Sequence, residues 1–167
     1  MPRRTRAILG TIAFLAVPGT VAGLGPWWIS GWRMQLPFLG LEPLRWVGAA
    51  LIAAGVVGLC ECFARFALVG SGTPSPAAPP ERLVVSGLYR RVRNPMYVAL
   101  VAAILGQALL TGSGQLLVYG AVIWLMFHLF VIAYEEPTLR RSFGADYEAF
   151  RAAVPRWIPR FTPWRGG

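Results

Sequence analysis

The sequence predicts an all-α membrane protein with about four transmembrane helices, followed by a C-terminal amphipathic helix at the membrane interface. Its 167 residues are 56% hydrophobic and only 14% charged, with a mean hydropathy of +0.54, which is far less charge than a soluble domain carries. Four apolar segments approach the roughly 20 residues that a helix needs to cross a bilayer. Arginines gather at one end of these segments. We therefore expect a single membrane domain spanning residues 1–167.

The predicted spans cover residues 7–24, 44–69, 96–110 and 115–134. The first follows a basic leader and resembles a cleaved signal peptide in its composition. We favour a retained span, because the apolar run continues to Trp27 and Trp28, a typical interfacial pair. The third span is short, and only the uncharged turn at residues 111–114 separates it from the fourth. These two are expected to form a tight antiparallel helical hairpin.

The arginines orient the predicted spans. All sixteen basic residues are arginine, and the formal net charge is +9. Thirteen of them flank one set of span ends, whereas Arg33 and Arg45 lie on the opposite side. This asymmetry places both termini in the cytoplasm and favours a membrane protein over a nucleic-acid-binding one. Arginine, alanine and glycine in place of lysine are typical of a GC-rich bacterial genome, which points to an inner membrane.

Two elements, residues 70–97 and 135–160, are expected on the cytoplasmic side. The first begins with GSGTPSPAAPP, whose prolines favour an extended path. In the second, apolar residues recur at three- or four-residue spacing with arginines between them. That pattern predicts a helix lying along the interface, divided at Gly144. Its apolar face consists of Leu139, Phe143, Tyr147, Phe150 and Val154.

A possible anion site lies at the start of the third span. Asn94 is a good N-cap residue, and Pro95 suits the first helical turn, where its missing N–H is not needed. Free backbone N–H groups and the positive end of the helix dipole then accompany Arg93, and together these hold a carboxylate or phosphate well. From spacing alone, a capped helix with an arginine facing lipid headgroups explains the pattern better.

The adjacent Glu135 and Glu136 at the end of the fourth span run against the basic pattern around them. Two neighbouring carboxylates repel each other and need cations nearby. Glu136 has Arg140 four residues on as a simple partner. The alternative, that at least one carboxylate binds a cationic ligand group, is equally well supported by the residues alone.

Other polar residues have simpler explanations. His128 lies seven residues before Glu135, on about the same helix face, and is either a packed core histidine or a catalytic base. Glu61 and Arg65 are spaced to neutralise each other within the second span. The chain's two cysteines are too few for a zinc site, so no metal is expected.

Residues 86–97 read SGLYRRVRNPMY. This stretch is similar to the Arg-His/Asn-Pro-x-Tyr motif of the isoprenylcysteine carboxyl methyltransferase and phospholipid methyltransferase superfamily. Residues 134–150, YEEPTLRRSFGADYEAF, resemble its second signature, and VPRWIP at 154–159 also fits. The resemblance covers the C-terminal half, and its specificity lies in the order and spacing of the three pieces.

The resemblance implies an integral membrane enzyme that binds S-adenosylmethionine at the cytoplasmic face. By analogy, Glu135 or Glu136 would hold the cofactor's ammonium, and Arg93 with the helix start would hold its carboxylate. The implied catalytic residues are Arg93, Glu136 and His128. The implied cofactor-binding residues are Arg93, Asn94, Pro95, Tyr97, Tyr89, Glu135 and Glu136, together with Gly70 and Gly72, which match the G-x-G element of the phospholipid branch.

The resemblance also implies a lipid or lipidated methyl acceptor, either a prenylcysteine-like carboxylate or a phospholipid amine. Asn94 stands where many relatives have histidine, which favours a carboxylate that attacks without losing a proton, unless His128 supplies a base. Two alternatives remain open at this stage. One is an NADPH-dependent membrane reductase of the sterol reductase type, and the other is a non-enzymatic membrane subunit or transporter.

Overall fold

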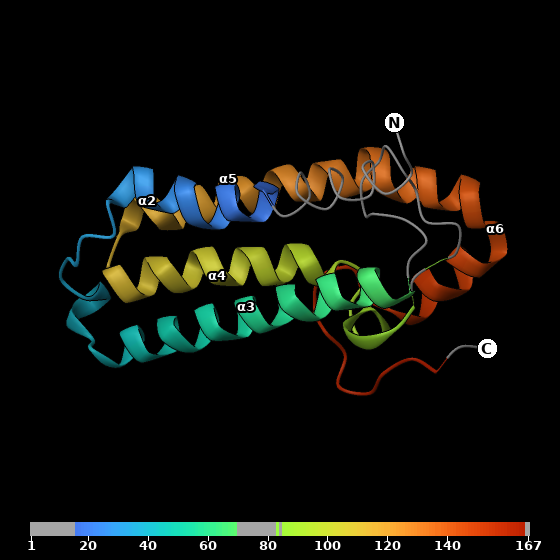
Figure 1. Ribbon diagram of the computed structural model, residues 1–167, viewed down its shortest axis with the longest axis horizontal. Coiled ribbons are helices and arrows are strands. Elements are labelled where there is room, and N and C mark those ends of the chain that lie inside the picture. The colour runs from blue at the N-terminus through green and yellow to red at the C-terminus, as the bar shows by residue number, and fades with distance from the viewer. Residues whose placement is uncertain (1–15, 70–82, 84, 166–167) are drawn as a thin grey trace.

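The computed structural model describes residues 16–69, 83 and 85–165, and within these ranges the chain is helical with no β-strand. Five α-helices are labelled in Figure 1, and α4 lies between α3 on one side and α5 with α2 on the other. Their bounds are Gly25–Ser30 for α2, Pro43–Val69 for α3, Pro95–Thr111 for α4, Gly114–Phe130 for α5 and Glu136–Ala153 for α6. The all-α prediction is therefore confirmed for the described residues.

Within the described ranges, two helices are long and apolar enough to cross a bilayer: Pro43–Arg65 and the continuous helix Gly114–Ala153, whose apolar part ends at Tyr134. The predicted third span corresponds to α4, a shorter apolar helix. Most of the predicted first span lies outside the described residues, although residues 16–24 are helical and continue into α2. The linker 70–80, with Gly70 and Gly72, also lies outside the described residues.

Helices α3 and α4 run antiparallel and approach each other closely at glycines. A Cβ atom at Gly106 would lie 2.6 Å from the carbonyl oxygen of Gly48, and one at Gly55 would lie 2.6 Å from that of Ala99. Small residues at such contacts let two backbones pack together where lipid provides no hydrophobic driving force. The pair therefore forms a rigid frame for the elements at its ends.

A π-helical turn, η1 (Thr20–Leu24), connects the N-terminal helix to the other layers. Such turns shift backbone carbonyls away from their usual helical partners. The Val21 carbonyl accepts a hydrogen bond from the Tyr119 hydroxyl of α5 at 2.9 Å, and the Ala22 carbonyl accepts one from Gln107 of α4 at 2.8 Å. The polar groups of the irregular turn are thus satisfied inside the helix bundle, as an apolar environment requires.

The predicted hairpin is confirmed, because only Gly112 and Ser113 separate α4 from α5. Gly112 ends α4 in the left-handed conformation with φ of 76°, which glycine adopts without strain. A side chain there would also collide with the carbonyl oxygen of Leu36, 2.2 Å from the position of a Cβ. The loop before α3 therefore packs directly over the hairpin turn.

The fourth predicted span continues into the C-terminal helix through a second π-helical turn, η4 (Val131–Glu135). Gly144 interrupts α6 with φ of 50° and ψ of −121°, which confirms the predicted division. The apolar face of α6 is covered within the protein: Tyr147, Phe150 and Val154 are buried and pack against Leu83, Val85 and Trp164. These three residues of the predicted apolar face are therefore covered by other segments of the chain.

We predict that Gly106→Ala lowers the free energy of unfolding by about 1–3 kcal/mol, the usual cost of overfilling a packed contact, because its Cβ has no space beside Gly48. Thermal or denaturant unfolding in detergent measures the change. Gly19→Ala is the matched control, since it is helical and exposed and has nothing within 4 Å of the added Cβ. Equal stability of the two variants would contradict the close α3–α4 contact.

Candidate functional site

The candidate site lies where α4 begins and α5 passes into α6, at the end of the molecule that also carries the C-terminal tail (Figure 1). The tail after α6 runs antiparallel to residues 90–93. The Arg93 amide donates to the Pro155 carbonyl, and the amides of Arg160 and Trp164 donate to the carbonyls of Arg91 and Arg90. The Arg90 and Arg91 guanidinium groups also donate to tail carbonyls, those of Trp164 and Phe161. The tail is thus fixed beside the first turn of α4.

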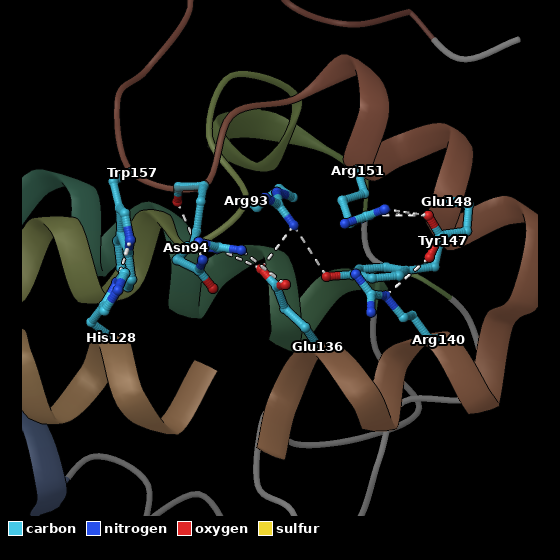
Figure 2. A network of polar contacts seen from close by, with 10 residues as sticks. Arg93, Asn94, His128, Glu136, Arg140, Tyr147, Glu148, Arg151 and Trp157 are labelled. Carbon is cyan, nitrogen blue, oxygen red and sulfur yellow. Dashed lines mark hydrogen bonds and ion pairs between the residues drawn. The ribbon is translucent and has the colours of Figure 1, made fainter. Parts of the chain in front are cut away.

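Glu136 is the centre of a buried ionic network (Figure 2). Its Oε1 accepts hydrogen bonds from Arg93 Nη1 at 2.9 Å and from Arg156 Nε at 2.6 Å, and its Oε2 accepts one from Arg156 Nη2 at 3.1 Å. Arg93 also donates to the Tyr147 hydroxyl at 3.3 Å. Only 7% of the Glu136 side chain and 10% of the Arg93 side chain are exposed. Two guanidinium groups face one carboxylate, so the network carries an excess positive charge.

The network fixes the protonation of Glu136. Burial alone would raise the pKa of its carboxyl, but the hydrogen bonds from Arg156 and the charges of Arg93, Arg156 and Arg140 hold that pKa below its ordinary value. Arg140 therefore contributes electrostatically, as its spacing suggested, while the direct partners come from segments far away in the sequence. Glu136 is ionised at neutral pH and is fully occupied by protein cations.

The helix start at residue 94 differs from its predicted form. Helix α4 does begin at Pro95, but the Asn94 side chain makes no capping hydrogen bond. Its Nδ2 instead donates to the Arg156 carbonyl at 3.2 Å, and the residue is buried. Asn94 is therefore a link between the helix start and the tail, and it keeps Arg156 in position beside Glu136.

Glu135 has a different environment from its neighbour. It is partly buried, and its Oε2 accepts a hydrogen bond from the Tyr97 hydroxyl at 3.2 Å. The Tyr97 ring stacks on Phe127 with ring centroids 4.5 Å apart. Burial and the adjacent Glu136 charge raise the pKa of the Glu135 carboxyl despite the Tyr97 hydrogen bond. Among the described residues, no Arg or His forms an ion pair with Glu135.

Tyr89 lies near this carboxylate. Its phenol interacts with the Cys62 thiol of α3 and is close enough to Glu135 and Tyr97 to feel their charges. The tyrosines at 89 and 97 and the carboxylate at 135 therefore come together, as the resemblance implied. They connect α3, the segment before α4, and the π-helical turn η4.

His128 lies apart from Glu136 in Figure 2 and contacts Trp157 of the tail. Its Nδ1 accepts a hydrogen bond from Trp157 Nε1 at 3.0 Å, and its ring stacks on Trp124 with centroids 5.1 Å apart. This acceptor role assigns the neutral ring's proton to Nε2. The geometry favours a positioning role over the predicted role as a base.

The structure thus brings together Arg93, Asn94 and Glu136 in one group and Tyr89, Tyr97 and Glu135 in another. It adds Arg156 and Tyr147, which sequence reasoning missed. Arg156 lies in the tail stretch VPRWIP. Its pairing with Glu136 spans 20 residues and a reversal of the chain, so no helical or strand periodicity in the sequence indicates it. Among the described residues, no cluster of three or more His, Cys, Asp or Glu side chains is arranged to bind a metal.

Comparison with known proteins gives a consistent family match. Residues 44–146 match the phospholipid methyltransferase family. A protein-S-isoprenylcysteine O-methyltransferase of Schizosaccharomyces pombe is 37% identical over 78 residues, 46% of this chain and 33% of that protein. Protein-S-isoprenylcysteine O-methyltransferase B of Arabidopsis thaliana is 28% identical over 134 residues, 80% of this chain and 60% of that protein.

A nickel-cobalt-cadmium resistance protein of Alcaligenes xylosoxydans xylosoxydans is also similar, with 28% identity over 123 residues, 72% of this chain and 55% of that protein. The chain spans less than two thirds of the length of each of these relatives. The family match includes α3, α4, α5 and the first half of α6, and hence both groups of candidate site residues except for the tail.

We predict that Glu136→Gln lowers the free energy of unfolding by roughly 3 kcal/mol at pH 7, because it leaves two guanidinium groups without their buried counter-charge. The pKa of Glu136 is lower in the folded state than in the unfolded state. Its stabilising contribution is therefore complete above an unfolded pKa of about 4.3 and is lost as the pH falls toward the folded pKa. The free energies of unfolding of the natural chain and of Glu136→Gln should therefore become equal in acid.

Glu148→Gln is the matched control. Glu148 pairs with Arg140 and Arg151 at the surface, where 47% of its side chain is exposed. We expect this variant to lose less than about 1 kcal/mol. A similar loss in both variants, or no pH dependence in their difference, would contradict the assignment of the network as a buried structural centre.

Proposed function

Because the chain belongs to the phospholipid methyltransferase family, we propose that it is a membrane methyltransferase. It transfers a methyl group from S-adenosylmethionine to a lipid or lipidated acceptor. The observation that carries this proposal is the contrast between the two adjacent glutamates. Glu136 is neutralised by Arg93 and Arg156, whereas Glu135 accepts a hydrogen bond from the Tyr97 hydroxyl and forms no ion pair among the described residues.

This contrast suits a ligand with one ammonium and one carboxylate. The half-buried Glu135 carboxylate lacks a cation, and an ammonium would satisfy it. The neighbouring network has two guanidinium groups for one carboxylate, and Arg93 Nε is buried without a hydrogen-bond partner among the described residues. A ligand carboxylate would be attracted to that excess charge. The residues therefore fit the methionine end of S-adenosylmethionine.

The remaining site residues have supporting roles in this proposal. Tyr97 orients Glu135, and its stack on Phe127 restricts the ring. Tyr89 adds a wall on the α3 side. Asn94 and Pro95 hold the helix start and the tail together, and His128 anchors Trp157. S-adenosylmethionine supplies an activated methyl group, so the protein's main tasks are alignment of the reactants and exclusion of water.

We infer that the acceptor attacks as a carboxylate. The Asn94 amide donates a hydrogen bond to the Arg156 carbonyl, and His128 Nδ1 accepts one from Trp157 Nε1. Neither side chain is therefore positioned to take a proton from the acceptor. A carboxylate nucleophile has no proton to lose and needs no base. The names of two relatives, both O-methyltransferases, agree with this inference.

We also propose the four-span arrangement with the site at the cytoplasmic face of a bacterial inner membrane. In support, the arginines of residues 90–93 and of the tail lie at the same end of the molecule, while Arg33 and Arg45 lie near the α4–α5 turn at the other end (Figure 1). This distribution agrees with the positive-inside pattern.

Calorimetry on the full chain in detergent tests the proposed cofactor. We predict binding of S-adenosylmethionine and S-adenosylhomocysteine and none of NADPH. A folded protein that binds NADPH would be a reductase, and one that binds none of the three would be a non-catalytic membrane protein. Either result would exclude the methyltransferase proposal.

The Glu135→Gln variant tests the site. We predict that it weakens S-adenosylhomocysteine binding at least about tenfold, the effect expected for a lost charge-assisted hydrogen bond, with little change in unfolding. Because the pKa of Glu135 is raised, binding to the natural chain should weaken as the pH falls through that pKa. This pH dependence should disappear in the variant.

Tyr97→Phe is the companion variant, since it removes the hydrogen bond and retains the ring. It should produce a smaller loss of affinity. If Glu135→Gln binds the ligand as tightly as the natural chain at every pH, the ammonium is held elsewhere and the assignment of Glu135 is wrong.

A further inference from the structure

A polar cavity lies beside residues 85–91, and neither Glu135 nor Glu136 lines it. Its volume is about 510 Å³. Helix α3 contributes one face, the segment before α4 contributes another, and Pro163 of the tail closes the rim. The polar lining residues are Glu61, Arg65, Ser86, Arg90 and Arg91.

Two oxygen atoms in this cavity lack hydrogen-bond partners. Glu61 Oε1 accepts from Arg65 Nε at 2.9 Å, but Glu61 Oε2 and Ser86 Oγ are buried without a partner among the described residues. Buried polar atoms are nearly always hydrogen-bonded in folded proteins. The simple (i, i+4) pairing expected from the sequence is therefore present, but it satisfies only half of the carboxylate.

Gly87 allows the carboxylate to occupy this position. A Cβ atom at residue 87 would lie 1.9 Å from Glu61 Oε1 and 2.8 Å from Arg65 Nε. The residue also has φ of +57°, a conformation that glycine adopts without strain. Any side chain at this position would displace the Glu61–Arg65 pair, so the pair rests directly on the backbone of residue 87.

The charge and the position of the cavity indicate the class of ligand that it would bind. Three arginines against one glutamate give the lining a net charge of +2, which favours an anion over a zwitterion. Arg65 is the last residue of the candidate span Pro43–Arg65, and this places the cavity at the depth of lipid headgroups. A hydroxyl group on the same ligand would give a hydrogen-bond partner to the Glu61 and Ser86 oxygens, which have none among the described residues.

We propose that this cavity binds the headgroup of an anionic glycerophospholipid that carries free hydroxyl groups, as phosphatidylglycerol does. The arginines hold the phosphate, and the headgroup hydroxyls donate to Glu61 and exchange a hydrogen bond with Ser86. Arginine is well suited to phosphate because its guanidinium donates two parallel hydrogen bonds. This lipid site is separate from methyl transfer and does not depend on that activity.

Native mass spectrometry of the full chain, released from detergent with defined lipids added, tests the proposal. We expect phosphatidylglycerol to be retained roughly tenfold more strongly than phosphatidylcholine, which has no hydroxyl donor and no net charge. Arg65→Gln should reduce this retention by about the same factor. Arg151→Gln is the matched control, since Arg151 also pairs with a glutamate but lies on α6 away from the cavity.

Two further variants test the specificity. Glu61→Gln raises the positive charge of the cavity, so it should bind phosphatidic acid at least as well as before and lose the preference for phosphatidylglycerol. Ser86→Ala should reduce that preference with no change in charge, and it provides the test if Arg65→Gln does not fold. Equal retention of all lipids, unchanged retention in Arg65→Gln or Ser86→Ala, or displacement by millimolar inorganic phosphate would overturn the proposal.

Discussion

The buried contact of Glu136 with Arg93 and Arg156 joins three parts of the chain that are distant in sequence: the start of α4, the junction of α5 with α6, and the C-terminal tail. Placing three charges in a dry environment is unfavourable unless each is paired and hydrogen-bonded. Glu136 meets this condition with three hydrogen bonds from the two arginines. Removal of Glu136 leaves two guanidinium groups without a counter-charge, and removal of either arginine takes away hydrogen bonds to the buried carboxylate. The position of Glu135, one residue away, therefore depends on the whole network.

The helix frame places this network at one end of the molecule. Glycines at the α3–α4 contact bring the two backbones together, and the π-helical turn η4 changes the direction in which Glu135 and Glu136 point relative to α5. The tail then covers the network through backbone hydrogen bonds to residues 90–93. The described parts of the site are therefore held by helix ends and by the backbone hydrogen bonds of the tail, which suits a reaction in which alignment is the main requirement.

Much of this arrangement could be predicted from the sequence. Apolar length predicted the helices, and the short uncharged turn predicted the hairpin. The motif around Arg93 and the acidic pair, which the resemblance singled out, lie together at one end of the molecule. The pairing itself could not be predicted, because Arg93, Glu136 and Arg156 meet only after the tail reverses direction. For the same reason Asn94 was expected to cap α4 and instead binds the Arg156 carbonyl. Helical periodicity shows that α6 has an apolar face, but only tertiary structure shows that Leu83, Val85 and Trp164 cover it.

In the proposed site Glu135, and not Glu136, receives the ammonium of the methyl donor, while the adjacent arginines attract its carboxylate. A crystal structure of the chain with S-adenosylhomocysteine bound would show both contacts. We expect the ligand's ammonium within hydrogen-bonding distance of the Glu135 carboxylate, with the Arg93–Glu136–Arg156 contacts still in place. A ligand bound away from Glu135, or a Glu136 that leaves its arginines to bind the ammonium, would contradict it.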